Sequence, residues 1–250
     1  MATIQVNCRF CNQTESVRKH GIGAAGFQRF RCLDCKRLFQ LDYAYEANKP
    51  EAKEQIIDMA MNSSGVRETA RLLKGGYNTV LRILKKITPK QVTTIPFDLA
   101  NIELICEVDE QWSFVGKKKN QRWLWYAWEP RFKRVIAHAF GKRDTDAFKE
   151  LQRLLSKFTI PFYCTDDYDV YSTNLPIEKH IIGKRYTQRI ERTNLTLRSR
   201  LKRLVRKTIG FSKSEEMHDK VIGTFIEREY YHESTGWSHD PKTYNHKSKY

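Results

Sequence analysis

The chain has 250 residues and a formal net charge of +16, with a pI near 9.6. Its length is enough for one sizeable core and a small additional module. No apolar run approaches the roughly 18 residues of a membrane-spanning helix, and the first residues lack the pattern of a secretory signal, so we expect neither secretion nor membrane insertion. The positive charge favours a polyanionic partner, nucleic acid first, over a basic protein that lacks such a partner.

Four of the six cysteines form two closely spaced pairs, Cys8 with Cys11 and Cys32 with Cys35. Two CxxC pairs at this spacing predict one tetrahedral Zn²⁺ site whose four thiolates leave no open position, so the zinc would be structural. Disulfides are disfavoured because no secretory signal is present, and a redox CxxC would not require two pairs. We predict a zinc ribbon over residues 1–46.

Helical periodicity replaces this pattern over residues 47–88. We expect helices over 51–61 and 66–73, a break at Gly75-Gly76, and a third helix capped by Asn78 whose apolar stripe ends at Ile87. Such an arrangement is typical of a helix-turn-helix, with Thr79, Arg82 and Lys85 on the outward face of the recognition helix. A helical hairpin that only packs against its neighbours is the alternative. Prolines and threonines then predict an extended linker over residues 89–101.

Strand character begins at residue 102. We expect strands over 102–108, 123–128, 134–140, 160–164 and 179–182, a turn from Gly116 through Asn120, and a helix over 147–158. The resulting order, β-β-β-α-β-α-β-α, is that of the RNase H-like fold, an α/β class with a mixed sheet covered by helices. We assign it to residues 102–231. A basic tail follows at 232–250, and disorder is one interpretation of it.

Acidic residues follow two of these apolar strands. Strand alternation alone does not distinguish Asp109 from Glu107 or Glu110, but the position at the strand end favours Asp109. After the later strand, Asp166 is favoured over Asp167 and Asp169 because it comes directly after the apolar run.

A third acidic residue, Glu191, opens a strongly basic helix expected over residues 188–206. Helical spacing places Glu191 on the edge of the apolar stripe, together with Arg198 and Lys202. A surface ion pair with Arg192 or Lys184 is the alternative role. Three carboxylates in these positions suit Mg²⁺ or Mn²⁺, which bind oxygen ligands.

The surroundings of Glu191 are rich in cations. Such an excess around a single acid predicts contact with a polyanion. The basic residues that we expect to bind DNA here are Lys184, Arg185, Arg189, Arg192, Arg198 and Lys202.

Several strings resemble the transposases of the insertion sequence one family. They are Asp109-Glu110-Gln111-Trp112, Gln121-Arg122-Trp123, Thr165-Asp166, the stretch from Lys184 to Leu195, Phe211-Ser212-Lys213-Ser214 and His218-Asp219. The likeness covers nearly the whole chain. By position it makes Asp109, Asp166 and Glu191 the DDE triad and matches Arg198 to the basic residue seven positions after the glutamate. Asp167 stands where such enzymes are expected to have glycine, which leaves the choice between Asp166 and Asp167 open.

The resemblance implies a two-metal mechanism that cuts the 3′ ends of an insertion sequence and joins them to target DNA. It also implies double-stranded DNA partners, namely terminal inverted repeats and target, a homo-oligomer on DNA, and a place in the prokaryotic cytoplasm at the nucleoid. No covalent protein intermediate is needed, so His138, His180 and His218 are expected to be structural or to contact phosphate. A zinc-dependent DNA-binding regulator without catalysis and an RNase H-type nuclease or resolvase are the alternative functions.

Overall fold

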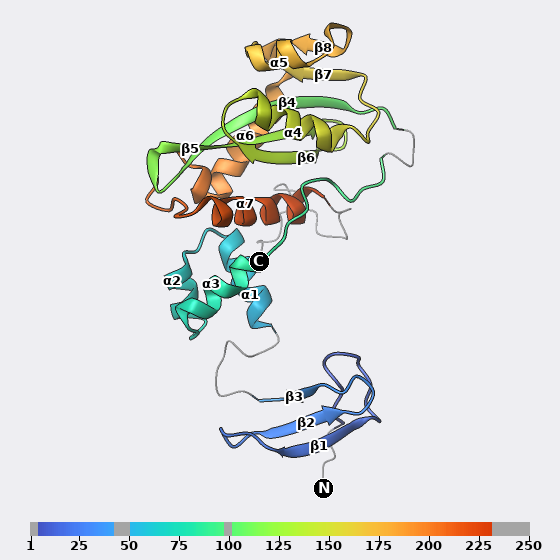
Figure 1. The fold of residues 1–250 in the computed structure, drawn as a ribbon, viewed down its shortest axis with the longest axis vertical. Coiled ribbons are helices and arrows are strands. Elements are labelled where there is room, and N and C mark those ends of the chain that lie inside the picture. Colours follow the sequence, from blue (N-terminus) through green and yellow to red (C-terminus); the bar gives the residue numbers. More distant parts are fainter. Residues whose placement is uncertain (1–4, 43–50, 98–101, 232–250) are drawn as a thin grey trace, which may run out of the picture. The chain divides into compact units, whose positions relative to one another are not determined.

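A computed structural model describes residues 5–42, 51–97 and 102–231 of the chain (Figure 1). The predicted tail at 232–250 lies outside these residues. The chain divides into two compact units, one of residues 1–60 with 64–83 and one of residues 61–63 with 84–250. Within the described residues, no helix is long and apolar enough to cross a membrane.

The amino-terminal part is a three-stranded antiparallel sheet of β1 (Val17–Ile22), β2 (Gln28–Cys32) and β3 (Leu38–Gln40). Its core is very small: the rings of Phe30 and Phe39 stack with centroids 5.7 Å apart beside the buried Cys8 and Cys32. So few apolar side chains stabilise a fold poorly without a cross-link or a metal.

Three helices follow: α1 (Ala52–Met61), α2 (Val66–Leu72) and α3 (Tyr77–Lys85). Apolar residues at helical spacing are buried in each, such as Ile56, Ala70 and Val80. Two details differ from the sequence predictions. The third helix begins at Tyr77, so Asn78 lies inside its first turn and does not cap it, and Ile87 lies beyond the end of α3.

The larger unit contains a five-stranded mixed sheet in the order β6-β5-β4-β7-β8. The strands are β4 (Ile105–Val115), β5 (Lys117–Glu129), β6 (Arg134–Gly141), β7 (Phe162–Thr165) and β8 (His180–Ile182). The first three strands pair antiparallel. β7 pairs parallel with β4, and β8 pairs parallel with β7. This topology confirms the predicted RNase H-like α/β fold.

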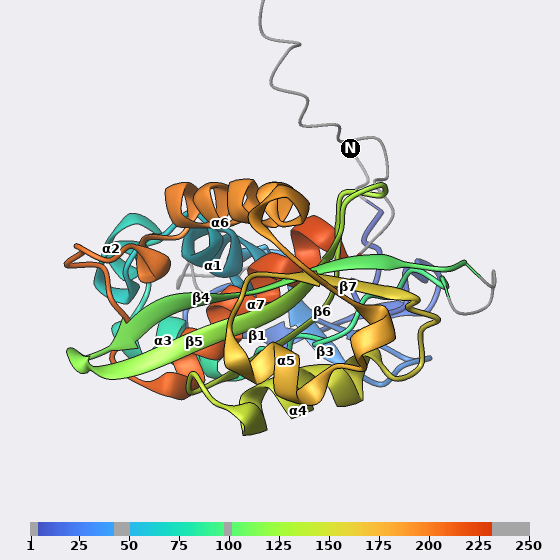
Figure 2. The same cartoon turned by 90° about the horizontal axis from the view of Figure 1, so that it is seen from above.

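Helices cover both faces of this sheet (Figure 2). One face carries α4 (Thr145–Leu155) and α5 (Asp169–Asn174), and the other carries α6 (Gln188–Arg200) and α7 (Glu215–Tyr230). The Asp144 carboxylate caps α4 by accepting a hydrogen bond from the Ala147 amide, and Phe148, Leu151 and Leu155 on α4 are buried in the core with Trp125.

Three predictions about element boundaries in this unit are wrong. β4 continues to Val115, so Asp109 lies within the strand and not at its end. The lysines after Gly116 belong to β5, because the turn is tight and Gly116 adopts a φ of 70°. α6 ends at Arg200, and Lys202 lies in a separate 3₁₀ turn. The segment expected to be an extended linker lies partly along β6, since Thr93 N donates to Ile136 O at 2.8 Å and Val92 bridges Ala137.

Candidate functional site

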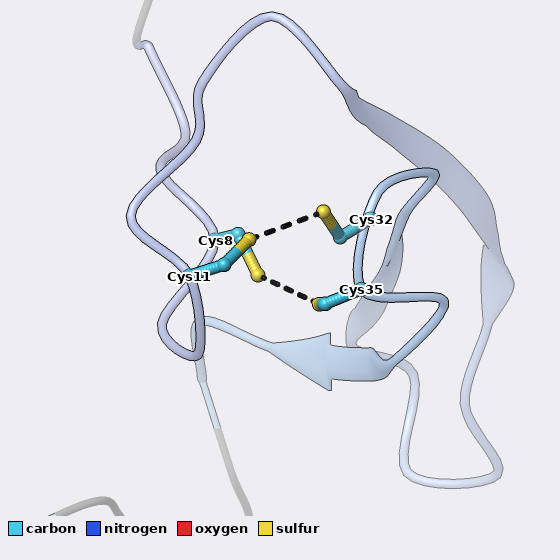
Figure 3. A group of neighbouring side chains, drawn as sticks. All are labelled: Cys8, Cys11, Cys32 and Cys35. Atoms are coloured by element: carbon cyan, nitrogen blue, oxygen red, sulfur yellow. Dashed lines mark hydrogen bonds between the residues drawn. The ribbon is translucent and has the colours of Figure 1, made fainter.

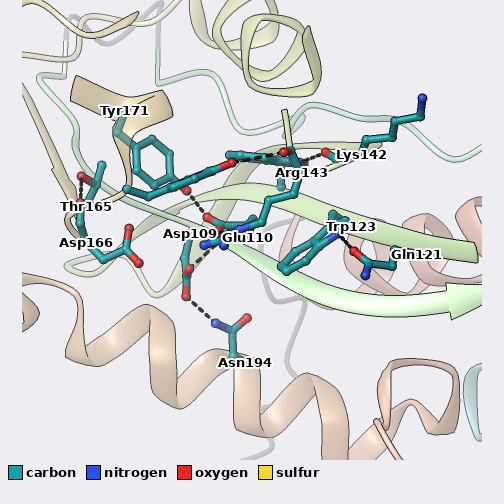
Figure 4. Close-up of polar contacts among 12 residues, drawn as sticks. Asp109, Glu110, Gln121, Trp123, Lys142, Arg143, Thr165, Asp166, Tyr171 and Asn194 are labelled. Carbon is teal, nitrogen blue, oxygen red and sulfur yellow. Dashed lines mark hydrogen bonds and ion pairs between the residues drawn. The ribbon is translucent and has the colours of Figure 1, made fainter. Parts of the chain in front are cut away.

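The parallel pairing of β4 with β7 brings two aspartates together. Three residue pairs define its register, from Ile105 opposite Phe162 to Glu107 opposite Cys164. Continuing this register by two residues places Asp109 beside Asp166, which follows directly after the last residue of β7. Figure 4 shows the two carboxylates next to each other at this edge of β4. Asp109 therefore lies beside Asp166 because β7 ends at this point, although β4 itself continues to Val115.

Asp109 is fixed by two hydrogen bonds. Its Oδ1 accepts from the Glu110 amide at 2.8 Å, and its Oδ2 accepts from Nδ2 of Asn194 on α6 at 2.6 Å. Tyr126, which lies opposite Asp109 on β5, donates its hydroxyl to Asn194 Oδ1 at 3.0 Å. The Tyr126 hydroxyl thus orients the amide so that its NH₂ group faces the carboxylate.

Glu107 and Glu110, the two residues that competed with Asp109 in the sequence, have other partners. Glu107 Oε2 accepts from the Ile190 amide at 2.7 Å and so satisfies a free N–H in the first turn of α6. Glu110 points to the opposite face of the sheet, where Arg143 Nη2 lies 2.6 Å from Oε1 and the Tyr171 hydroxyl donates to Oε2 at 2.5 Å. Both oxygens of Glu110 are thus engaged away from Asp109, and Glu107 is bound to the backbone of α6.

The electrostatics of this pair suit a cation. Burial, followed by the negative charges of Glu110 and Asp166, raises the pKa of Asp109 to about 7. Asp166 Oδ1 is buried and has no hydrogen-bond partner among the described residues. A buried carboxylate oxygen without a donor is costly, and a divalent cation would compensate both this oxygen and the repulsion between the two carboxylates. The donors present therefore fit Mg²⁺ or Mn²⁺.

Glu191 is exposed on α6, one turn before Asn194 and on the same side of the helix. Among the described residues, the only group of three or more possible ligands with all donor atoms within 4.8 Å of one another is the cysteine cluster. The structure thus brings Asp109 and Asp166 together and does not bring Glu191 within that distance of both. Asp167 is exposed, and Asp169 lies in the first turn of α5.

The basic residues expected to bind DNA lie around this site. Arg198 is half-buried. Burial, followed by the positive charge of Arg206, lowers the pKa of Arg198, and the Asp109 carboxylate partly opposes this shift. At the start of α6, a pocket of about 310 Å³ is lined by Glu107, Arg131, Arg185 and Arg189. The other predicted DNA-binding side chains of this segment, Lys184, Arg192 and Lys202, are exposed.

The four predicted zinc ligands form one cluster (Figure 3). The Sγ atoms of Cys8 and Cys35 are 3.5 Å apart, and those of Cys11 and Cys32 are 3.6 Å apart. A tetrahedral site with Zn–S bonds of about 2.3 Å requires sulfur separations of roughly 3.8 Å, so this arrangement fits Zn²⁺. On α3, Arg82 and Lys85 are exposed and Thr79 is half-buried.

Asn194, Tyr126 and Arg143 were not predicted as site residues. A signal for Asn194 was present, since a short polar residue three positions after Glu191 lies among the buried positions of an otherwise basic helix. Tyr126 and Arg143 gave no such signal, because their roles depend on pairing across the sheet and on the Arg143–Glu110 contact.

A cysteine cluster of zinc-ribbon type, a helix-turn-helix and an RNase H-like domain with paired aspartates together define a protein class that acts on DNA. Three family models match successive parts of the chain: InsA N-terminal domain over residues 1–36, InsA C-terminal domain over residues 43–87, and IS1 transposase over residues 103–232. The chain belongs to the IS1 transposase family.

The chain is also similar to InsB proteins of insertion elements. The insertion element iso-IS1n protein InsB of Shigella dysenteriae is 56% identical over 125 residues, which cover 50% of this chain and 95% of that protein. The insertion element IS1 9 protein InsB of Escherichia coli K12 is 46% identical over 148 residues, covering 59% of this chain and 89% of that protein. An InsB of Haemophilus ducreyi matches to the same extent. Family membership supports a transposase role and DNA binding.

Proposed function

We propose that this transposase binds the terminal inverted repeats of its insertion sequence, cleaves the 3′ ends and joins them to target DNA by metal-dependent phosphoryl transfer. The observation that carries the proposal is the half-buried pair of Asp109 and Asp166, which lie side by side through the β4–β7 register, with one buried Asp166 oxygen left without a partner among the described residues. Two neighbouring carboxylates in a domain with many exposed basic side chains suit metal ions that act on phosphates.

In this proposal Asp109, Asp166 and Glu191 are the catalytic carboxylates and hold Mg²⁺ or Mn²⁺. When bound, the cations would neutralise developing charge on the phosphate and activate the attacking oxygen. Asn194 keeps the Asp109 carboxylate in one orientation through its 2.6 Å hydrogen bond. Glu107 holds the first turn of α6, and this contact sets the position of the turn that carries Glu191.

The remaining charges bind the substrate. The half-buried Arg198, whose pKa the Asp109 carboxylate raises, and the exposed cations Lys184, Arg185, Arg189, Arg192 and Lys202 bind the DNA backbone. The exposed Arg82 and Lys85, with Thr79, contact the inverted repeat through α3. A structural Zn²⁺ on Cys8, Cys11, Cys32 and Cys35 holds the amino-terminal ribbon.

We assign the zinc ribbon to residues 1–46, the helix-turn-helix to 47–88, a connecting segment to 89–101 and the catalytic domain to 102–231. Cutting and joining two ends requires two active sites, so the protein acts as a homo-oligomer on DNA. Its substrate places it at the nucleoid of a prokaryotic cytoplasm.

The test compares Asp109→Asn, Asp166→Asn and Glu191→Gln with Asp167→Asn as the matched control. Labelled DNA carrying the element's ends is incubated with a target plasmid and Mg²⁺, and nicked and joined products are separated on a gel. The three substitutions should abolish both products while end binding persists, and Asp167→Asn should retain most activity. Near-normal joining by Glu191→Gln, or loss of activity only in Asp167→Asn, contradicts the assignment. Nicking without joining by the unaltered protein indicates a nuclease, and binding without nicking indicates a regulator.

A further inference from the structure

Two separate segments bring exposed cations to one end of the catalytic domain. The first is the start of β5, where Lys117, Lys118 and Lys119 follow the tight turn at Gly116 and all three are exposed. The second is the stretch after α6, where Lys202, Arg206, Lys207 and Lys213 are exposed. These seven residues are called the basic edge below. Neither segment, 116–122 or 201–213, contains an acidic residue.

The two segments are fastened to each other. Gly116 N donates to Ser212 O at 2.8 Å, and Val115 forms a parallel bridge with Ser212. The rings of Phe114 and Phe211 lie 5.4 Å apart beneath this junction. Figure 1 shows the β4–β5 turn beside the chain that links α6 to α7. The basic edge is therefore a fixed feature of the fold, built from residues about 90 positions apart in sequence.

The cations of the basic edge are uncompensated. Among the described residues, none of the seven forms an ion pair, whereas Arg122, farther along β5, pairs with Asp219 at 2.5 Å and with Glu215 at 3.3 Å. Like charges held close together repel unless an anion neutralises them. Arg206 of the edge and the Asp109 carboxylate both influence Arg198: the charge of Arg206 lowers the pKa of Arg198, and Asp109 raises it.

We infer that the basic edge binds the phosphate backbone of duplex DNA on one side of the bond at which the carboxylates act. This inference rests on the proposed function for the identity of the polyanion. Gly116 lies seven positions after Asp109, just beyond the end of β4, which is about 23 Å at roughly 3.3 Å per residue. At about 3.4 Å per base pair, the edge contacts DNA about seven base pairs from the active site.

The test uses the full-length protein, a random-sequence 30-base-pair duplex and no divalent metal, with affinity measured from low to moderate NaCl concentration. Lys117→Gln, Lys118→Gln and Lys119→Gln are combined in one variant. The matched control combines Lys142→Gln, Lys149→Gln and Lys157→Gln, which remove the same charge from exposed positions beside and on α4. A third variant changes Lys117, Lys118 and Lys119 to Arg.

The edge variant should reduce the slope of log K against log salt by about 2 to 3, because each phosphate contact contributes about 0.9. The α4 control and the arginine variant should keep the original slope. If the slope falls equally in the edge and α4 variants, only the net charge of the protein matters. If the slope is unchanged in the edge variant, these lysines do not contact phosphates. Either result overturns the inference. Because no metal or cleavage is involved, an inactive catalytic triad does not alter this outcome.

Discussion

Asn194 Nδ2 donates a 2.6 Å hydrogen bond to Asp109 Oδ2, and this bond connects α6 to the centre of the sheet at the candidate active site. The Asn194 side chain is held on its other side by the Tyr126 hydroxyl at 3.0 Å. A carboxylate that must hold a cation benefits from a fixed orientation, because outer partners of metal ligands tune both affinity and geometry.

Asn194→Ala should therefore lower the rate of end cleavage by roughly 10- to 100-fold and raise the Mg²⁺ concentration needed for half-maximal rate. Tyr126→Phe should have the same effect to a smaller degree, since the amide stays but loses its orienting partner. Thr196→Ala, on the exposed side of the same helix, is the control. A slower rate with unchanged Mg²⁺ dependence would indicate that Asn194 only stabilises the fold.

Loss of zinc should unfold the amino-terminal ribbon and leave the catalytic domain folded. Cys8→Ser or Cys35→Ser removes one of four thiolates, and in so small a module the free energy of zinc binding is largely the free energy of folding. Metal analysis should find one Zn²⁺ per chain in the original protein and little in either variant. Protease should then cleave within residues 5–42 first. Cys164→Ala, outside the cluster, should keep its zinc, and zinc-free original protein would contradict the assignment.

Arg82→Ala and Lys85→Ala test the outward face of α3. If these side chains contact bases, discrimination between end DNA and random DNA should fall by about 1 to 3 kcal/mol per contact. If they contact only phosphates, binding to both DNAs should weaken together. Binding is measured by titration of labelled duplexes, with Lys53→Ala on α1 as an exposed control. Unchanged binding to both DNAs would place recognition elsewhere.

Acid should destabilise the catalytic domain through His218. This imidazole is buried between Ser113 Oγ and Ser212 Oγ, each 2.9 Å away. Burial, with the charges of Arg203 and Arg122 next, lowers its pKa to about 3. Unfolding restores a pKa of about 6.5, so the unfolded chain binds more protons between these values and stability falls as pH decreases below about 6.5.

Between pH 7.5 and pH 5 this group should reduce the free energy of unfolding by about 2 kcal/mol. The raised pKa of Asp109, about 7, has the opposite effect, since it stabilises the folded state as pH decreases. The acid sensitivity of each variant is therefore compared with that of the original protein. Urea unfolding of His218→Gln at both pH values should show about 2 kcal/mol less acid sensitivity than the original protein. His20→Gln, on the exposed β1, is the control. Equal acid sensitivity in all three proteins would exclude His218 as the cause.

The sequence was sufficient for the cysteine cluster, the helix-turn-helix and the strand order, because each follows from local spacing or periodicity. The sequence pattern favoured Asp109 over Glu107 and Glu110 because it was expected at the end of its strand, and that reason is wrong. Its strand continues to Val115, and what marks the residue is the end of the neighbouring β7, which depends on pairing between segments about 57 residues apart. Tyr126 was missed because its contacts cross from sheet to helix, and local patterns do not record such contacts. Asn194 was missed although its place among the buried positions of α6 marked it.

The β4–β7 pairing also determines where this chain tolerates a change in length. Only three residue pairs define the register that aligns Asp166 with Asp109. One residue added within Phe162–Thr165 would displace the second aspartate by about 3.3 Å and reverse the faces of the side chains beyond it. An addition in the connection after α4, between Ser156 and Thr159, leaves the ladder itself unaltered. Natural length variation and peptide-tag insertion should therefore occur in that connection and be absent from the four residues of β7.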